Sequence, residues 1–345
     1  MSITSQHRDT GGSGVSGLNQ PAGGAEAGLS GVERLQLRLI ERAKDVVRPV
    51  ARARFVVERR KYRGCTVLAP QSGNQLLAAT IREGRPMAVA KIGAAELFSI
   101  RHYLAHRDAA GSVQDWGRHA VRLYKCAGVF PVDAAEHSRF ARTYLDAVGQ
   151  IDALAVWFRW GERAVVRDYA PHATYIPMSA LEPFRHFQPW SAALHGKRVL
   201  VVSPFGMTIR AQYERRELVW AGRPGVLPDF EMDVLCPPPH AHLVPPVDLN
   251  WSSALARLKD EMTARDWDVA VIGAGAWSLP LAAHARALGR WGIHLGGATQ
   301  LLFGVLGARW ERDDEIRKLA NAAWTRPSAE ERPQRYLTVE EGCYW

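Results

Sequence analysis

Several patterns that would define a class of protein at once are missing from this chain of 345 residues. It has no run of about 18 uncharged apolar residues, so the sequence predicts no membrane-spanning helix. Its first residues, from Met1 to Gln6, lack the basic region and apolar core of a secretory signal. The 4 cysteines are widely spaced and form no CxxC pair. This spacing argues against a disulfide framework or a structural zinc site and favours reduced thiols in the cytoplasm.

Well-known catalytic motifs are also missing. The sequence contains no GxxxxGKS or GxxxxGKT phosphate loop, no GxSxG elbow and no HExxH pair. P-loop kinases, serine hydrolases of the α/β type and zinc peptidases are therefore disfavoured. A GxG pair at Gly273 and Gly275 follows an apolar run, but Ser278 stands at the third glycine position of a dinucleotide fingerprint. No acidic residue follows about 20 positions later, which disfavours NAD binding.

The positive charge is concentrated at the start of the chain. Residues 1–63 contain 12 Lys and Arg against 6 Asp and Glu, whereas the whole chain has a net charge of +9. Two thirds of the excess thus belongs to fewer than a fifth of the residues. A basic body would suggest a nucleic-acid partner, but this body is only weakly basic, so we expect no nucleic-acid binding.

The composition divides the chain into three parts. Residues 1–31 are rich in glycine and have little to bury, so we expect a disordered tail. Residues 32–63 alternate apolar and basic positions, which predicts a basic amphipathic helical arm. This arm either packs on the body as a solvated helix or makes peripheral contact with anionic lipid. A nucleic-acid arm is the least favoured reading, since Phe55 and Tyr62 are its only aromatic residues. Residues 64–345 form the body.

The body reads as strands that alternate with helices. Apolar runs predict strands at 87–91, 153–157, 198–202, 269–272 and 292–295, and periodicity predicts helices at 74–83, 94–106, 134–148, 207–220, 251–265, 277–289 and 298–306. Strands this uniformly apolar belong to a parallel sheet that is covered on both faces. We therefore predict an α/β fold, a Rossmann-like and mostly parallel sheet with helices on both faces. The proline-rich stretch 237–246 predicts a surface loop.

Ligands of such sheets bind beyond the carboxyl ends of the strands. Two of these ends carry side chains that could transfer protons. Glu96 follows the strand at 87–91 and either caps the next helix or faces the ligand. His294 ends the strand at 292–295 and is either a proton carrier or a buried histidine bonded to backbone.

Two further strand ends combine glycine with small residues. The segment 203–208 leads into a helix, whose N-terminal N–H groups either bind an anion or merely follow a turn. The segment 273–278 forms the GxG turn described above. Together with Gly296 and Gly297, these turns are candidates for close contact between backbone and phosphate.

The C-terminal third carries a family resemblance. The strings GAWSLPLA (Gly275–Ala282), IHLGGATQLLFG (Ile293–Gly304), GARW (Gly307–Trp310) and the closing EGCYW resemble bacterial GT-D type glycosyltransferases. The similarity extends over about residues 75–345. It implies a Rossmann-like fold that binds a nucleotide sugar.

One segment departs from the family pattern. Well-studied members have Arg-Phe-Gly-Asp-Gly-Glu, whose two carboxylates are associated with metal and donor binding, whereas this chain has Lys-Ile-Gly-Ala-Ala-Glu at 91–96. Gly93 and Glu96 match, Lys91 keeps the positive charge, and Ala94 replaces the aspartate. A divalent metal, Mn²⁺ or Mg²⁺, would then have Glu96 as its single carboxylate ligand and would need donor phosphates and water.

The resemblance implies a hexosyltransferase that moves a sugar from a nucleotide diphosphate sugar to a polysaccharide or glycolipid precursor. It would work in the cytoplasm, with membrane contact at the inner face through residues 32–63. Glu96 or His294 would deprotonate the acceptor hydroxyl. The residues expected to bind substrate are Lys91, Gly93, Ser203, Phe205, Gly206, Arg210, Gly273, Gly275, Trp277, Gly296, Gly297 and Gln300. The alternatives are a degenerate module that binds nucleotide or glycan without turnover and another nucleotide-dependent Rossmann-type transferase.

Overall fold

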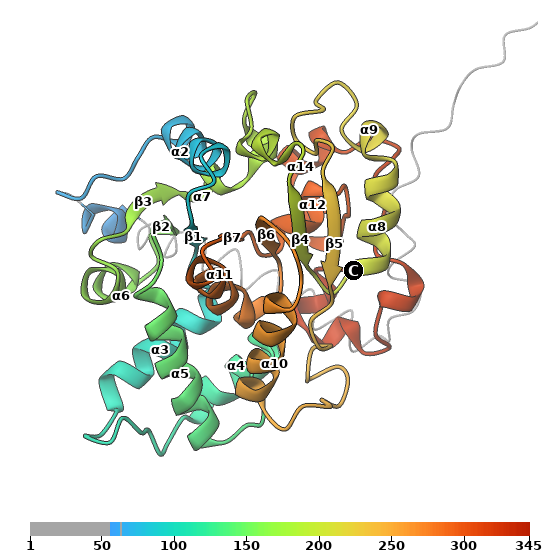
Figure 1. Ribbon diagram of the computed structural model, residues 1–345. Coiled ribbons are helices and arrows are strands. Elements are labelled where there is room, and N and C mark those ends of the chain that lie inside the picture. Colours follow the sequence, from blue (N-terminus) through green and yellow to red (C-terminus); the bar gives the residue numbers. More distant parts are fainter. Residues whose placement is uncertain (1–55, 63) are drawn as a thin grey trace, which may run out of the picture. The chain divides into compact units, whose positions relative to one another are not determined.

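The computed structural model describes residues 56–62 and 64–345 (Figure 1). The predicted tail at 1–31 and most of the predicted arm at 32–63 lie outside the described residues. The end of the arm is described: residues 56–60 are helical, and Tyr62 is buried with 4% of its surface exposed. Tyr62 packs in the same core as the sheet, so its position belongs structurally to the body.

Seven strands form one parallel sheet. They are β1 (Met87–Ala90), β2 (Ala153–Val156), β3 (Thr174–Pro177), β4 (Arg198–Val202), β5 (Glu231–Leu235), β6 (Val269–Ile272) and β7 (Trp291–His294). Their order across the sheet is β3-β2-β1-β7-β6-β4-β5. Every pairing is parallel; Val89 of β1, for example, is in register with Ala153 of β2 and Ile293 of β7. The predicted α/β fold class is confirmed.

The helices are α2 (Pro70–Arg82), α3 (Ala94–His106), α4 (Gly117–Ala127), α5 (Ala134–Val148), α6 (Glu162–Tyr169), α7 (Met178–Leu181), α8 (Gly206–Glu214), α9 (Arg216–Val219), α10 (Trp251–Thr263), α11 (Ser278–Ala287), α12 (Ala298–Leu302), α13 (Ala308–Glu311) and α14 (Asp314–Leu319). Short 3₁₀ helices lie at Pro183–Arg185, Trp190–Leu194, Gly275–Trp277, Ala329–Glu331, Tyr336–Thr338 and Glu340–Gly342.

Helices cover both faces of the sheet, as predicted (Figure 1). Successive strand residues point to opposite faces, so the alternate residues of β1 enter two different cores. Ala88 and Ala90 pack with residues of α3, α5, α10 and α11, whereas Met87 and Val89 pack with residues of α2, α8 and α12. Because both faces are buried, the central strands are apolar except at two ends, Arg198 at the start of β4 and His294 at the end of β7.

The two edge strands, β3 and β5, were not predicted. They lie at opposite ends of the sheet and lack the continuous apolar runs of the central strands. In β5, Glu231 is exposed and Asp233 is half-buried, because one side of an edge strand faces solvent. Polar residues are tolerated there, so the apolar pattern that revealed the central strands is absent.

Two predicted helices break or end four or more residues before the expected position. The helix predicted at 207–220 is divided at Arg215, whose backbone (φ −112°, ψ 24°) is not helical. The helix predicted at 298–306 ends at Leu302, and Gly304 follows with φ +66°. The expectation for 237–246 is confirmed, since these residues form neither helix nor strand.

Two sequence-based exclusions can also be compared with the structure. All four cysteines, Cys65, Cys126, Cys236 and Cys343, are free, so the expectation of unpaired thiols is confirmed. Within residues 56–62 and 64–345, no helix has the length and apolar character needed to cross a bilayer.

The strand order creates a switch point between β1 and β7. From β1 the chain moves outward to β2 and β3, and the remaining strands fill the other side of the sheet until β7 closes against β1. The carboxyl ends of β1 and β7 are therefore neighbours whose following segments diverge. This is the place where doubly wound sheets bind their ligands.

Candidate functional site

The segment after β1 places Glu96 at the switch point. Gly93 is the N-cap of α3 and Glu96 lies in its first turn. A Cβ atom on Gly93 would overlap the Glu96 carboxylate, so the side chain folds back over this glycine. Burial raises the pKa of Glu96, while the backbone N–H groups of Glu96 and Ala95, which donate to its carboxylate, act in the opposite direction. Gly93 thus positions Glu96.

The segment after β7 brings His294 and Gly296 to Lys91. A Cβ atom built on Gly296 would lie 3.0 Å from Lys91 Nζ and 3.4 Å from His294 Nε2. Gly296 also has φ +66°, a conformation that favours glycine. We refer to Lys91, Glu96, His294 and Gly296 as the β1–β7 cluster. The structure therefore unites these four predicted site residues.

The two basic groups of the β1–β7 cluster are shifted towards their neutral forms. Partial burial lowers the pKa of Lys91 to about 8, although the nearby carboxylates of Glu182 and Glu96 raise it. Burial and the positive charge of Lys91 hold the pKa of His294 well below its ordinary value. His294 is therefore neutral at pH 7. Its Nδ1 atom is buried and has no hydrogen-bond partner within the described residues.

Three exposed arginines extend the positive charge of Lys91. Lys91 Nζ lies 5.3 Å from the centre of the Trp157 ring, and the Arg159 guanidinium lies 4.7 Å from the same ring. Partial burial lowers the pKa of Arg159, and the charges of Arg122 and Arg309 lower it further. Arg309 also lowers the pKa of Lys91. Four cations thus act on one region, and the sequence analysis assigned only Lys91 a role there.

A buried carboxylate holds the loop that carries Arg159. Glu162 accepts hydrogen bonds from the backbone N–H of Trp157, at 3.2 and 3.1 Å, and from the hydroxyl of Tyr62, at 3.1 Å. Burial raises the pKa of Glu162 to about 7. Phe158, between Trp157 and Arg159 in the chain, has φ +55°. This backbone conformation is strained for a residue other than glycine. The loop is thus fixed at both ends in a strained form.

The C-terminal segment supplies a second acid. Glu340 lies 3.4 Å from the guanidinium of Arg309 and raises the pKa of Glu96 in addition to the effect of burial. Glu340 and Glu341 have φ +45° and +60°, a second strained turn. The Gln300 side chain donates to the carbonyl of Tyr344 at 2.9 Å, and a Cβ on Gly297 would lie 3.3 Å from the Tyr344 ring. Gln300 and Gly297 therefore hold this segment against the site.

The turn after β4 is engaged differently. The backbone N–H groups of Met207 (2.7 Å) and Thr208 (3.2 Å), at the start of α8, donate to the carboxylate of Glu331, and the hydroxyl of Thr208 donates to it as well. A carboxylate of the chain itself therefore occupies the position expected for a phosphate. The predicted anion role of Gly206 does not fit this arrangement.

Three other residues predicted near Gly206 lie apart from the β1–β7 cluster. The Ser203 hydroxyl accepts from the backbone N–H of Phe205, and Phe205, 3% exposed, packs against the Trp345 ring. Arg210 donates to the carbonyl of Val234 in β5, the third strand beyond β7. At about 4.8 Å per strand, this separation is about 14 Å.

Backbone N–H groups expected to bind phosphate are also engaged. Gly273 donates to the carbonyl of Val202 and Gly296 to that of Ile272, which extends the sheet hydrogen bonds. Gly275 faces the carbonyl of Ala127, and Trp277 is 4% exposed and stacks on another buried tryptophan. Two N–H groups of the predicted phosphate cradle, those of Gly273 and Gly296, are therefore already used within the sheet. Side-chain cations gather at the site instead.

The donor set fits a resident metal poorly. Across the described part of the chain, no group of three or more His, Cys, Asp or Glu side chains is arranged to hold a metal ion. Glu96 is already bonded by N–H groups of α3 and lies beside the ammonium of Lys91, which would repel a cation. Divalent ions of the Mg²⁺ type prefer several oxygen ligands. We therefore derive no step through a metal.

Comparisons with known proteins give a distant fold likeness. No family model matches the chain, and no curated protein sequence matches it significantly. A solved structure described as "the highly conserved domain of unknown function 1792 has a distinct glycosyltransferase fold" is 16% identical, with a TM-score of 0.31, and covers 63% of this chain and 81% of its own. A selenomethionine-substituted structure of domain of unknown function 1792 is also 16% identical, with a TM-score of 0.30 and coverage of 64% and 82%.

Proposed function

We propose that this chain is a glycosyltransferase that moves a sugar from a nucleotide diphosphate sugar to a hydroxyl of a polysaccharide or glycolipid precursor. One observation carries the proposal: Lys91, Glu96 and His294 meet at the switch point of a parallel sheet, with further cations beside them. The sequence resemblance to GT-D type enzymes falls on the same segments. Nucleotides bind at such switch points in doubly wound sheets.

The cations provide what the leaving group needs. As the bond between the sugar carbon and the phosphate oxygen breaks, the electron pair stays on the nucleoside diphosphate. Lys91, Arg159 and Arg309 stabilise that developing negative charge. Arginine is suited to this role because its planar fork matches two phosphate oxygens. Side chains thus replace the backbone cradle expected from the glycine turns.

Glu96 is the proposed general base. The acceptor oxygen attacks the sugar carbon, and its proton moves to the Glu96 carboxylate. The raised pKa of Glu96 makes it a stronger base than an ordinary carboxylate, whereas the lowered pKa of His294 makes the imidazole a weak one. His294 instead offers its unpaired Nδ1 as a neutral hydrogen-bonding group.

Substrate entry requires a movement. Glu96 and His294 are only 7% and 5% exposed. The segment with Glu340 and Tyr344 lies next to both the Glu96 carboxylate and the Gly297 turn. In this proposal the segment moves aside when the donor binds and returns to exclude water.

The test is a titration of the full chain with uridine, guanosine and thymidine diphosphate sugars, with and without Mn²⁺, followed by a product assay. We expect one donor to bind and to be slowly hydrolysed without an acceptor. Glu96→Gln should lower turnover about 100-fold or more, since it removes the base, and should leave donor affinity and unfolding temperature nearly unchanged. Glu315→Gln is the matched control, because that side chain is 67% exposed and forms an exposed ion pair with Lys318. Full activity of Glu96→Gln would refute the role of Glu96.

A binding module without turnover is the second candidate. It is favoured by Ala94, which replaces the family's aspartate, and by the hydrogen bonds that let Glu96 serve as an ordinary cap of α3. The same titration separates the two candidates. Binding without any turnover supports the module, and binding of none of the donors contradicts both.

We also propose that the basic arm brings the enzyme to an anionic membrane surface. Tyr62 is part of the core, so the deletion that tests this should end at residue 55. We expect the truncated chain to lose binding to vesicles that contain phosphatidylglycerol, with neutral vesicles as the control. Unchanged vesicle binding would remove the membrane proposal and leave the enzymatic one intact.

A further inference from the structure

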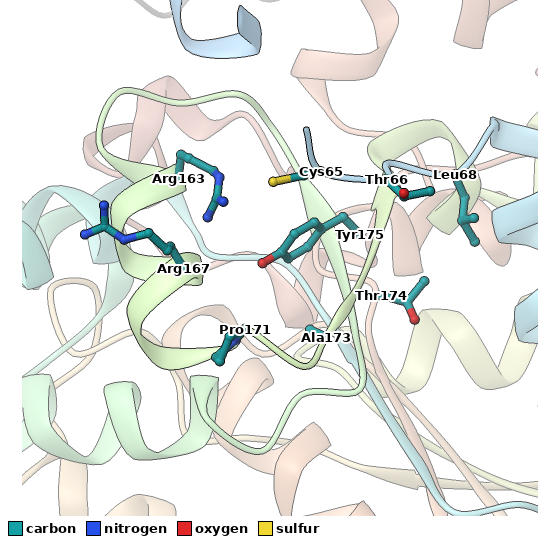
Figure 2. A pocket seen from close by; sticks show the side chains of 9 residues that line it. All are labelled: Cys65, Thr66, Leu68, Arg163, Arg167, Pro171, Ala173, Thr174 and Tyr175. Carbon is teal, nitrogen blue, oxygen red and sulfur yellow. The ribbon is translucent and has the colours of Figure 1, made fainter. Parts of the chain in front are cut away.

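A pocket of about 470 Å³ lies away from the β1–β7 cluster, between α6 and the edge strand β3 (Figure 2). Its third wall is the segment 65–68, which pairs with β3 through Val67 and Tyr175. This volume lies within the range of small-molecule sites and is several times larger than a single phosphate ion. We refer to it as the α6–β3 pocket.

The charge of the pocket lining is one-sided. Arg163 and Arg167 both contribute to it, and none of its lining residues is acidic. Arg167 is exposed and pairs with its neighbour Asp168. Figure 2 shows Arg163 reaching from α6 towards Cys65 and Tyr175. The charge that remains to be balanced in this pocket is therefore that of Arg163.

Arg163 is short of partners. Its Nε and Nη1 atoms are shielded from water, and neither has a hydrogen-bond partner among the described residues. The nearby Glu162 is engaged by Tyr62 and Trp157. Glu58 pairs with Lys61 through Oε1, and its buried Oε2 has no hydrogen bond to Arg163, although both residues line a neighbouring pocket. Charged N–H groups that lack both water and a hydrogen-bond acceptor lower the stability of the folded chain. A ligand that supplies the acceptor would remove this cost.

The contact of Arg163 with the Tyr62 ring does not supply the missing hydrogen-bond acceptors. The guanidinium lies 5.6 Å from the centre of the Tyr62 ring, a cation–π distance. Such a contact uses the face of the guanidinium, whereas its N–H groups point outward within its plane. An anion in the pocket would supply the missing acceptor once the guanidinium turns about its last side-chain torsions. Its Nε and Nη edge offers two parallel donors, which match two oxygens of a phosphate.

The remaining lining suits the organic part of a ligand. The pocket lining includes the hydroxyl groups of Thr66, Thr174 and Tyr175. The Tyr175 hydroxyl donates a long hydrogen bond of 3.4 Å to the carbonyl of Ala170. These groups can bond the hydroxyls of a sugar or glycerol unit. From the unbonded Nε and Nη1 atoms of Arg163 and the acid-free lining we propose that the α6–β3 pocket binds a phosphomonoester on a small polyol, such as a sugar phosphate or the headgroup of a phosphatidic acid. This site is independent of the donor site at β1 and β7.

The test uses glucose 6-phosphate and inorganic phosphate as soluble probes, and phosphatidylcholine vesicles with and without phosphatidic acid as the lipid probe. We expect glucose 6-phosphate to bind the full chain saturably and more tightly than inorganic phosphate. Arg163→Gln should weaken that binding about tenfold or more, since a charge-assisted pair of hydrogen bonds is lost. Arg317→Gln removes the same charge from an exposed helix position and should bind as the wild type does.

A measurement on the wild-type chain tests the proposal even if Arg163→Gln does not fold. Cys65 lines the pocket and is half-buried, whereas Cys236 is exposed elsewhere. Glucose 6-phosphate should slow the alkylation of Cys65, measured by peptide mass spectrometry, and leave that of Cys236 unchanged. Because the basic arm is itself expected to bind anionic lipid, phosphatidylglycerol vesicles of equal charge are the reference. Tighter binding to phosphatidic acid than to phosphatidylglycerol vesicles, lost in Arg163→Gln, would assign the phosphate to a lipid headgroup. Absence of Cys65 protection with both phosphate sources, or equal binding by a folded Arg163→Gln variant, would overturn the proposal.

Discussion

The turns after β4 and β7 occupy equivalent places at the carboxyl ends of parallel strands but differ in their contacts. Both follow a buried parallel strand, contain glycine and lead into a helix. After β4, the N–H groups of Met207 and Thr208 are taken by Glu331, more than 120 residues further along the chain. After β7, Gly296 instead gives room to the side chains of Lys91 and His294. A glycine turn before a helix can therefore bind an anion only where no distant residue, such as Glu331, already bonds its N–H groups.

The largest expected effect is a loss of donor affinity when the cation after β1, beside the β7 turn, is removed. Lys91→Gln removes the cation at the switch point, and we expect it to weaken donor binding by about 100-fold, since hydrogen bonds to charged groups contribute about 1.5–3 kcal/mol. Arg210→Gln removes an exposed cation near the β4 turn and should change affinity less than about twofold. Calorimetric titration of both variants with the same donor is the measurement. A larger loss in Arg210→Gln than in Lys91→Gln would reverse the assignment of the two turns.

The next effect concerns stability at β4. Glu331→Ala leaves the start of α8 without its carboxylate, and we expect it to lower the free energy of unfolding by about 1–2 kcal/mol, as for lost helix caps. Donor affinity should not change. Urea unfolding measures the first quantity, and the neighbouring exposed Glu330→Ala is the control. Should Glu331→Ala instead acquire affinity for a nucleoside diphosphate, the β4 turn would be an anion site masked by Glu331.

The smallest effect is a pH dependence at β7. Burial lowers the pKa of Lys91 to about 8 in the chain without ligand, so raising the pH through 8 removes the cation. Donor affinity should therefore be full below pH 7 and fall about tenfold between pH 7 and pH 9. Lys91→Arg keeps its charge throughout this range and should abolish the fall. An identical pH profile for the wild type and Lys91→Arg would exclude Lys91 as the titrating group.

The fold could be predicted from the sequence wherever burial on both sides leaves a signature. Central strands such as β1 and β6 are apolar at every position, and α3 and α5 have the predicted bounds. The edge strands β3 and β5 escaped because one side of each faces solvent. Sequence patterns report how buried a segment is, and edge strands are only partly buried.

The site was predictable in part. Lys91, Glu96 and His294 stand at strand ends, and the parallel sheet brings such ends to one edge. Arg309 and Glu340 come from the far end of the chain, and no local pattern links them to β1. The engagement of the Gly206 turn by Glu331 was equally invisible, because it depends on how residues 320–345 pack over the sheet. Contacts between segments that are distant in the sequence could not be predicted from it.

The position of β7 has a consequence for biosynthesis. It is the last strand to leave the ribosome, yet it lies in the middle of the sheet. Until it arrives, β3-β2-β1 and β6-β4-β5 are two half-sheets whose inner edges, β1 and β6, have unpaired backbone groups. Unpaired apolar edges of this kind favour aggregation of nascent chains. A chain interrupted before Trp291 should therefore depend on chaperones and collect in inclusion bodies, whereas the complete chain can close its own sheet.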